Sequence, residues 1–307
     1  MRLSIREHVP LAPLTTFQIG GKARYLVEVK TEEEIKEAIL WAREREVRPI
    51  ILAGGSNVLV PDEELDALVI LITSNDSSFV DNELEADAGC NLLHLIRAAA
   101  ERNLGGLEKL SGIPGTIGGA VRGNAGAFGP EIKDFVVRVR AIDTELCDIR
   151  EFDNDTCDFS YRHSFFKDHP EWIITRVRVK LERSDTSMSK QLIEKTIRER
   201  ERRHIQDVRA AGSFFVNPVA SKEVREMFEK EKGMKSREGR VPAGWLIEKV
   251  GMKGARVGDA VASEQHPNYI KNDGEATAAQ VRELAQKIKN AVQEKFGIEL
   301  QEEAVVL

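Results

Sequence analysis

The chain has 307 residues, of which 41% are hydrophobic and 31% are charged. That length predicts two or three domains, and the composition excludes an intrinsically disordered chain. The formal net charge of −6 produces no overall field that would attract nucleic acid or an anionic membrane, so any anionic ligand must be held by local groups.

The first third of the chain predicts a mixture of helices and strands. Thr31 and Glu34 have the spacing of a capping box, so a helix is expected to begin at Thr31. A short buried strand follows at residues 49–52. Further elements are expected as a buried strand at 65–72, a half-exposed strand at 84–89 and a helix that Asn91 caps and that extends to Glu101.

The second half of the chain continues this mixture. Residues 137–141 and 175–181 alternate strictly, which is typical of half-buried strands with their arginines facing solvent. The highly charged residues 189–203 predict an exposed helix between two domains. The last helix should begin at Thr277 and end at Gly297, before a terminal apolar strand. Because helices and strands interleave without a regular βαβ order, the expected fold class is α+β.

The cysteines and the N-terminus indicate the compartment. Cys90, Cys147 and Cys157 are odd in number and lack CxxC spacing, so reduced thiols are expected in place of a disulfide framework or zinc site. The histidines show no metal-ligand spacing, and no metal is expected. The N-terminus has no signal-peptide pattern, and no stretch approaches the ~20 apolar residues of a membrane span. A soluble, cytoplasmic protein is therefore expected.

Glycine-rich loops carry the strongest functional signal of the residues alone. Residues 111–127 contain six glycines, which allow the backbone to approach a ligand and turn N–H groups toward an anion. This segment lacks both the Lys-Ser/Thr pair of a P-loop and the GxGxxG of a dinucleotide fold. A second loop, residues 53–57, follows a predicted buried strand. Together the loops favour an extended ligand that contains phosphates, although tight turns without a ligand are an alternative.

Motifs over nearly the whole chain resemble the UDP-N-acetylenolpyruvoylglucosamine reductase family. In family order they are residues 14–21, 54–57, 110–119, 124–127, 161–166, 211–215 with 217–218, 243–248, 266–270 and 300–303. The resemblance, to the shorter family type, implies an FAD-binding region of the vanillyl-alcohol-oxidase (PCMH) type with two subdomains, followed by an α+β substrate domain. The implied boundaries are 1–72 with the strand 298–307, 73–205, and 206–297.

The resemblance also implies a reaction. NADPH would reduce a non-covalent FAD, and hydride would then reach the enolpyruvyl group of UDP-N-acetylglucosamine enolpyruvate, giving UDP-N-acetylmuramate for peptidoglycan synthesis. Hydride addition leaves an enolate-like intermediate that needs a cation and a proton donor. The family pattern assigns carboxylate binding to Arg162 and proton donation to Ser213, and it identifies Glu303 as the catalytic glutamate. Glu302 is the less favoured acid, because it would point to the opposite strand face.

The remaining site residues come from the same resemblance. Those implied for FAD are Ala53, Gly54, Gly55, Ser56, Asn57, Ser111, Gly112, Ile113, Gly115, Thr116, Gly118, Gly119, Asn124 and Gly126. Those implied for the substrate are Tyr161, Asn217, Lys253 and His266. The plain alternatives are a surface role for Arg162 and His266 and a turn-capping role for Ser213.

Four departures from the family pattern stand out. Val216 replaces a usual lysine, and Val305 replaces a basic residue that often follows the catalytic glutamate. Ala53 replaces a common glycine, and Arg122-Gly123 replaces bulkier residues. A flavin oxidase for another substrate and a UDP-sugar-binding protein without turnover are therefore alternatives, although the three proposed catalytic residues together disfavour the oxidase. The expected state is a monomer without nucleic-acid or membrane partners.

Overall fold

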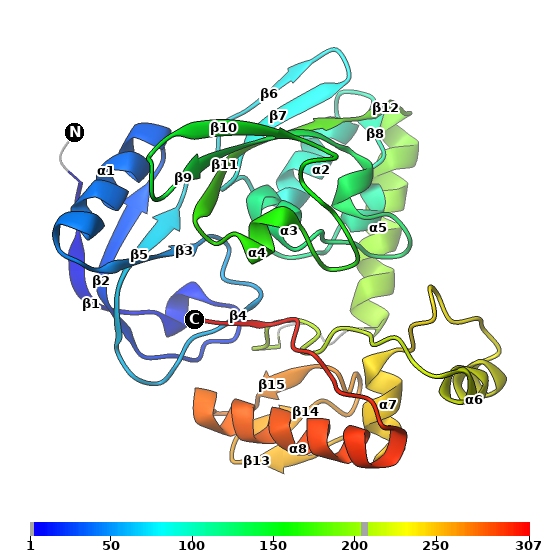
Figure 1. Cartoon of the computed structure of the whole chain (residues 1–307). Helices are drawn as coiled ribbons and strands as arrows, with labels where there is room; N and C mark the ends of the chain where they lie inside the picture. The colour runs from blue at the N-terminus through cyan, green and yellow to red at the C-terminus, as the bar shows by residue number, and fades with distance from the viewer. Residues whose placement is uncertain (1–2, 204–207) are drawn as a thin grey trace. The chain divides into compact units, whose positions relative to one another are not determined.

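The computed structural model describes residues 3–203 and 208–307, which form two compact units (Figure 1). Unit 1 comprises the segment ending at Val9 together with Ala23–Gly55 and Asp66–Arg202, and unit 2 comprises Pro10–Lys22, Ser56–Leu65 and the chain from Arg203 onward. The boundary near Arg203 falls at the end of the charged helix, where the sequence predicts a domain junction. The division into three functional parts stays a prediction.

Unit 1 begins with a four-stranded sheet. In sheet order its strands are β1 (Arg6–Pro10), β2 (Lys22–Val29), β5 (Leu65–Ile72) and β3 (Arg48–Leu52). The β3 and β5 strands run parallel and match the two buried strands predicted from sequence. Their apolar side chains pack with α1 (Glu32–Glu44), whose buried residues are those that the helical periodicity predicts.

The start of α1 confirms one half of the predicted capping box and corrects the other. The Thr31 hydroxyl accepts the Glu34 N–H at 3.2 Å, as expected. The Glu34 carboxylate, however, accepts the N–H of Lys30 at 2.6 Å, one residue before the expected partner. The chain enters this helix from β2, and the carboxylate bonds the amide that precedes the cap.

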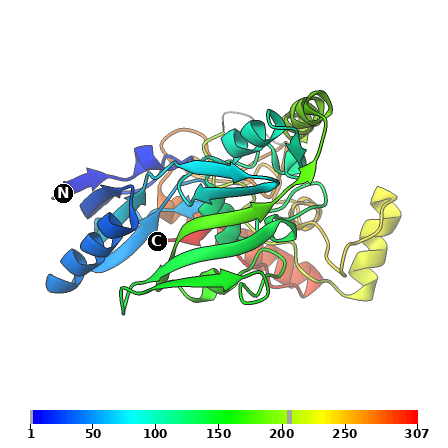
Figure 2. The same cartoon turned by 90° about the horizontal axis from the view of Figure 1, so that it is seen from above.

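A five-stranded antiparallel sheet forms the rest of unit 1. In sheet order it contains β10 (Ile149–Asp153), β9 (Val136–Asp143), β11 (Trp172–Lys180), β7 (Glu83–Asp87) and β6 (Ser77–Val80). Figure 2 shows these strands lying side by side. The predicted alternating strands are present in longer form. On one face they pack against α2 (Leu92–Ala100), α3 (Ile117–Arg122) and α4 (Phe165–Asp168) (Figure 1).

The long helix of unit 1, α5 (Thr186–Arg203), begins three residues before the predicted start. Asp185 explains the difference, because its carboxylate accepts the Met188 N–H at 2.9 Å and so caps an earlier turn. Ile193 and Thr196 form the buried part of its narrow stripe. A small pair, β8 (Leu104–Gly105) with β12 (Glu182–Arg183), precedes this helix.

In unit 2, α8 (Ala278–Phe296) packs across the small sheet β13-β14-β15, beside α7 (Ala243–Lys249) (Figure 1). Both halves of the predicted capping box between Thr277 and Gln280 are present, and Gly297 ends α8 with φ 65°. The other elements are η1 (Ala12–Leu14), β4 (Val58–Leu59), α6 (Lys222–Lys232), β13 (Arg256–Val257), β14 (Ala260–Ala262), β15 (Ile270–Asn272) and β16 (Val305–Val306).

The predicted terminal strand is mostly irregular. Only β16 is a strand, and it pairs in parallel with β4. The residues before it bond a different segment instead: the Val216 N–H donates to the Gln301 carbonyl, and Phe215 bridges to Glu302. Because the terminal residues change partners within a few positions, no single regular strand can form.

Two of the cysteines are deep in unit 1. Burial raises the pKa of Cys90 to about 11 and that of Cys157 to about 12, so both groups are thiols at neutral pH. Cys147 is partly exposed. Among residues 3–203 and 208–307, no helix is both long and apolar enough to cross a bilayer.

Candidate active site

The two predicted glycine loops meet in unit 1. β3 ends at Leu52 and leads into Gly54, where an added Cβ would lie 2.8 Å from the Cα of Gly115. The two backbones therefore touch, and a side chain at Gly54 has no room. Gly115 also has φ 112°, a conformation that L side chains rarely adopt. The local structure thus requires glycine at the positions that the sequence assigns to the cofactor.

Ser111 begins the longer loop and is fully buried. Its hydroxyl has no hydrogen-bond partner within the part of the chain that the structure describes. A buried polar group in this state costs about 1–3 kcal/mol, which a bound polar ligand could offset. In contrast, the Thr116 hydroxyl accepts the Gly119 N–H at 3.2 Å and caps α3. Ser111 and the touching glycines therefore fit a site for a ligand with polar groups.

Three other residues predicted to bind the cofactor make close contacts or hydrogen bonds within the protein itself. An added Cβ on Gly118 would lie 2.7 Å from the Cβ of Ala88, and one on Gly126 would lie 2.7 Å from the Cγ of Glu131. The fully buried Asn124 amide donates to Glu131 and to the carbonyl of Ser160. Any contact of these residues with a ligand would have to use the backbone, and their place in the site stays a prediction.

The short loop also leads toward the predicted acid. The boundary between the units falls after Gly55, and Asn57 belongs to unit 2. Its amide donates to the Glu303 carbonyl at 3.0 Å, and its own carbonyl accepts the Val305 N–H. Asn57 therefore holds the backbone on both sides of Ala304. The Asn57 side chain thus holds the segment around Ala304, a role that sequence motifs alone do not indicate.

Ser213 and Glu303 lie on hydrogen-bonded segments in unit 2. The N–H of Glu303 donates to the Phe214 carbonyl at 2.8 Å, so the residue after Ser213 is fixed directly to Glu303. Buried Asn268 exchanges hydrogen bonds with both backbone groups of Phe215 through its side chain. Asn268 lies in the motif 266–270, which by itself indicates no role for this residue. The structure shows that Asn268 positions the Ser213 segment.

The side chain of Glu302 makes a structural contact. Its carboxylate forms a 2.7 Å ion pair with Lys289 of α8. This pairing occupies the Glu302 carboxylate with a structural contact. The preference for Glu303 over Glu302 as the catalytic glutamate stays a prediction.

Arg162 occupies a strained turn in unit 1. Its φ of 58° is rare for a residue with a side chain, and the flanking Ser160 and His163 bond each other's backbone twice at 3.1 Å. The guanidinium donates to the Gly126 carbonyl at 2.9 Å and lies over the Tyr161 ring. These contacts fix the turn and give the Arg162 guanidinium two neighbours within unit 1, and its role in binding the substrate stays a prediction.

The predicted substrate residues of unit 2 differ in their contacts. Asn217 accepts the Ala243 N–H at 2.9 Å and so caps α7. Lys253 is exposed, with its ammonium 3.8 Å from Glu248. His266 packs edge-on against Tyr269. Lys253 is thus the most open of the three to an incoming ligand, and all three assignments stay predictions.

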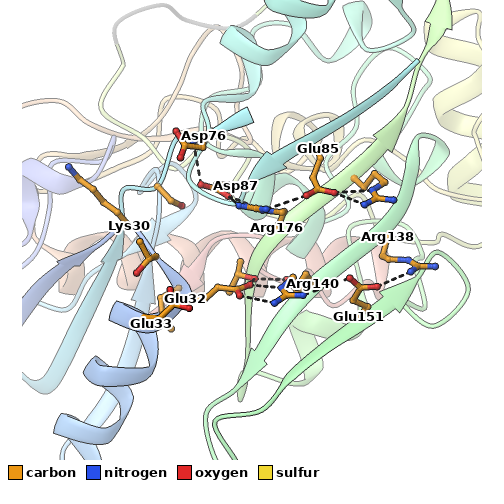
Figure 3. Close-up of a pocket in the computed structure, with 15 residues that line it drawn as sticks. Lys30, Glu32, Glu33, Asp76, Glu85, Asp87, Arg138, Arg140, Glu151 and Arg176 are labelled. Carbon is orange, nitrogen blue, oxygen red and sulfur yellow. Dashed lines mark hydrogen bonds and ion pairs between the residues drawn. The ribbon is translucent and has the colours of Figure 1, made fainter. Parts of the chain in front are cut away.

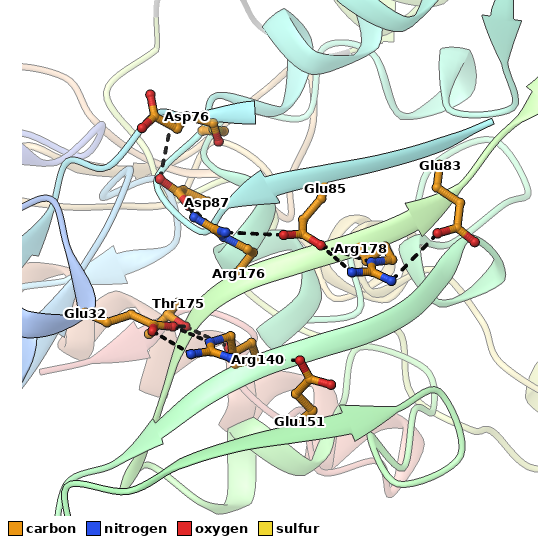
Figure 4. Close-up of polar contacts among 11 residues, drawn as sticks. Glu32, Asp76, Glu83, Glu85, Asp87, Arg140, Glu151, Thr175, Arg176 and Arg178 are labelled. Atoms are coloured by element: carbon orange, nitrogen blue, oxygen red, sulfur yellow. Dashed lines mark hydrogen bonds and ion pairs between the residues drawn. The ribbon is translucent and has the colours of Figure 1, made fainter. Parts of the chain in front are cut away.

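A groove of about 340 Å³ lies on the charged face of the five-stranded sheet, next to the start of α1 (Figure 3). Its arginines pair with carboxylates of neighbouring strands and of α1 (Figure 4). The shortest pairs are Arg140 with Glu32, Arg176 with Asp87, Arg178 with Glu85, and Arg138 with Glu151, at 2.6–2.8 Å. Because each of these charges has a partner within the protein, the groove is an ion-pair lattice that joins α1 to the sheet.

Glu32 is the acid through which α1 joins this lattice, and replacing it should destabilise unit 1. Its carboxylate accepts two hydrogen bonds from Arg140 and a 2.7 Å bond from the buried Thr175 hydroxyl. We expect Glu32→Gln to lower the free energy of unfolding by about 1–3 kcal/mol, since charge-assisted bonds are lost. Urea denaturation of the purified protein measures the change. The exposed neighbour variant Glu33→Gln should unfold like the wild type.

The effect of Glu32 should depend on pH. Burial alone would raise the pKa of Glu32, but hydrogen bonds from Arg140 and Thr175 and the charges of Arg140 and Arg176 outweigh it and hold the pKa below its ordinary value. A depressed folded pKa stabilises the protein above the unfolded pKa, and this contribution is lost as pH falls through the folded value. The difference in the free energy of unfolding between the wild type and Glu32→Gln should therefore become smaller as the pH falls. A difference that stays constant would contradict this role.

Comparison with known proteins gives a consistent result for both parts of the chain. Residues 23–147 match a family described as FAD binding domain, and residues 203–307 match UDP-N-acetylenolpyruvoylglucosamine reductase, C-terminal domain. The reductase of Pseudomonas aeruginosa is 36% identical over 99% of both chains. That of Solibacter usitatus is 35% identical over 98% of this chain and 96% of its own length.

A solved structure extends the likeness to three dimensions. The crystal structure of the reductase from Thermus caldophilus superposes with a TM-score of 0.77, at 32% identity, and covers 100% of this chain and 99% of its own. The predicted α+β fold, with an FAD-binding domain before a C-terminal α+β domain, is confirmed. The touching glycine loops and the buried Ser111 hydroxyl fit this cofactor.

Proposed function

The chain belongs to the UDP-N-acetylenolpyruvoylglucosamine reductase family and is an FAD-dependent oxidoreductase, and from this premise we propose that it reduces UDP-N-acetylglucosamine enolpyruvate with NADPH as the hydride source. The product is UDP-N-acetylmuramate, a precursor of peptidoglycan. The observation that carries the proposal is the direct bond from the Glu303 N–H to the carbonyl after Ser213, which places the proposed proton donor and acid on adjacent backbones.

The glycine loops provide the cofactor site in this proposal. Bound FAD supplies the hydride-transfer chemistry. Gly54 and Gly115 keep side chains out of the place where the loops touch, and Ser111 offers a buried hydroxyl for a polar group of the cofactor. The remaining predicted cofactor residues complete the site through backbone groups. Their common task is to bind and orient the cofactor.

Arg162 binds the substrate carboxylate in this proposal. A guanidinium stays charged at all physiological pH values and can donate two parallel hydrogen bonds to a carboxylate. When hydride adds to the terminal carbon of the enolpyruvyl group, negative charge spreads toward this carboxylate. The strained turn holds the guanidinium in place beforehand, so its favourable interaction with the developing charge needs little reorganisation.

Ser213 completes the reduction by donating its hydroxyl proton to the carbon that carries the carboxylate. A serine hydroxyl is a weak acid, but the carbanion-like carbon is strongly basic, so the transfer is feasible. The buried Asn268 fixes the backbone that follows Ser213. Glu303 is the acid on the adjacent segment. We further propose a monomeric cytoplasmic enzyme whose residues 206–297 bind the substrate.

A two-stage anaerobic titration tests the function. The purified holoenzyme should be yellow, NADPH should bleach the flavin, and UDP-N-acetylglucosamine enolpyruvate should then restore the oxidised spectrum rapidly. Bleaching without recovery would point to another electron acceptor and would contradict the proposed substrate. A protein that stays colourless after addition of FAD would contradict the flavin site itself.

A further inference from the structure

Arg122 is a cation that the reaction described above does not use. It ends α3, within the glycine-rich segment, and its residue is only partly accessible to solvent. Within residues 3–203 and 208–307, no carboxylate forms an ion pair with its guanidinium, and burial is what lowers its pKa below the ordinary arginine value. Burying an unpaired charge is costly, so the sequence would be expected to avoid it unless another group supplies the counter-charge.

The backbone around Arg122 is fixed to the turn that carries Arg162. The Arg122 carbonyl accepts the Ser164 hydroxyl at 2.8 Å, and the Asn124 amide donates to the Ser160 carbonyl at 2.7 Å. The Arg162 guanidinium itself bonds the Gly126 carbonyl. Three hydrogen bonds thus join segments 122–126 and 160–164. The two arginines therefore belong to one rigid local structure.

The nearby acid is already committed to other groups. Glu131 accepts the Asn124 amide at 2.9 Å and forms a 3.1 Å ion pair with Lys133. The Ser164 hydroxyl is likewise used, since it is buried and donates to the Arg122 carbonyl. An anion bound here would supply the counter-charge that these groups do not.

We propose that Arg122 is a second oxyanion-binding residue of this local structure, acting beside Arg162 on a carboxylate or phosphate group of a bound ligand. The inference rests on the proposed function, which supplies two such ligands, the UDP-sugar substrate and FAD. A guanidinium suits both, because its planar donors match carboxylate and phosphate oxygens. Because the chain carries a net negative charge, a local cation must hold any anionic ligand. Arg122 is such a cation.

The test compares Arg122→Met with Arg122→Lys in the purified holoenzyme. Methionine keeps a long apolar stem without charge, and lysine keeps the charge without the planar donors. FAD affinity is measured by flavin fluorescence, and substrate affinity by the change that UDP-N-acetylglucosamine enolpyruvate causes in the oxidised flavin spectrum. Loss of a charge-assisted contact should weaken one of these affinities about 10- to 100-fold in Arg122→Met. Arg122→Lys should recover part of the loss.

The two ligand sources give different results. Weaker substrate binding with full FAD occupancy identifies the substrate oxyanion, whereas weaker FAD retention identifies the cofactor diphosphate. Unchanged affinity for both FAD and the substrate in Arg122→Met would overturn the role of Arg122. The control Arg282→Met, at an exposed arginine, should leave both affinities unchanged. Thermal unfolding checks that each variant folds. If UDP-N-acetylglucosamine enolpyruvate never reoxidises the reduced flavin of the wild type, the proposed function is wrong. The effect of the Arg122 variants on FAD affinity alone then decides the role of Arg122.

Discussion

Replacing Ser213 with alanine should slow flavin reoxidation by UDP-N-acetylglucosamine enolpyruvate by about 10²- to 10⁴-fold, the usual contribution of a positioned general acid. Reduction of the flavin by NADPH should keep its wild-type rate, because that half-reaction needs no proton donor at the substrate carbon. Anaerobic stopped-flow absorbance measures the two half-reactions separately. The expected result is therefore a loss confined to the second half.

The structure makes this a clean substitution. The backbone that follows Ser213 is held by Asn268 and by the Glu303 N–H, and none of these bonds uses the Ser213 side chain. Removing one hydroxyl should therefore leave Glu303 in place. Ser78→Ala, on an exposed strand, controls for the loss of a serine and should behave like the wild type. Equal losses in both half-reactions would remove Ser213 from the role of proton donor.

Local signals in the sequence predicted the starts of α1, α2 and α8 correctly. Thr31, Asn91 and Thr277 each accept a backbone N–H three residues later, as their types and spacing indicate. Such caps act over a single turn, so the residues that form them are visible in a short window. The buried faces follow the 3.6-residue period for the same reason. At Glu34 the prediction was wrong only about which backbone N–H the carboxylate accepts.

Long-range pairing was less accessible to sequence reasoning. Unit 2 includes Pro10–Lys22 and Ser56–Leu65, which are far in the sequence from the rest of that unit. The reason is visible at Asp62, whose carboxylate accepts the N–H groups of Ala278 and Ala279 at the start of α8. Ala278 and Ala279 are 216 and 217 positions from Asp62 in the sequence, so no local sequence pattern predicts the contact. The same holds for the terminal segment, which divides its bonds between Phe215 and β4.

The candidate site shows the same division. Family motifs indicated Ser213, Arg162 and Glu303, because chemistry restricts those residue types. The positioning residues Asn57 and Asn268 act through hydrogen bonds to distant backbone, so their roles need the structure. Arg122 is similar: its sequence position suggested only a departure from the family, and the missing counter-charge becomes evident from its surroundings.

The glycine contact leads to the second large effect. We expect Gly54→Ala to abolish stable FAD binding, with a fall in affinity of at least about 10²-fold, because the new Cβ would lie 2.8 Å from the Gly115 Cα. Backbone occupies both sides of this contact, so no flexible side chain can move aside, and relief requires the loops to separate. Since the whole binding site depends on these loops, the purified variant should be colourless. Quantifying the released flavin and titrating with FAD measure the effect.

Gly123→Ala supplies the matched control. The nearest atom to its added Cβ is the Gly119 carbonyl oxygen at 3.6 Å, an ordinary contact, and the residue ends α3 with φ −93°. Neither Gly54 nor Gly123 has a positive φ, so alanine is not strained by backbone conformation at either position, and the comparison isolates the close approach of the loops. Gly123→Ala should therefore retain its FAD. If Gly54→Ala also stays yellow with normal affinity, the loops can separate without loss of the site, and the cradle does not depend on their contact.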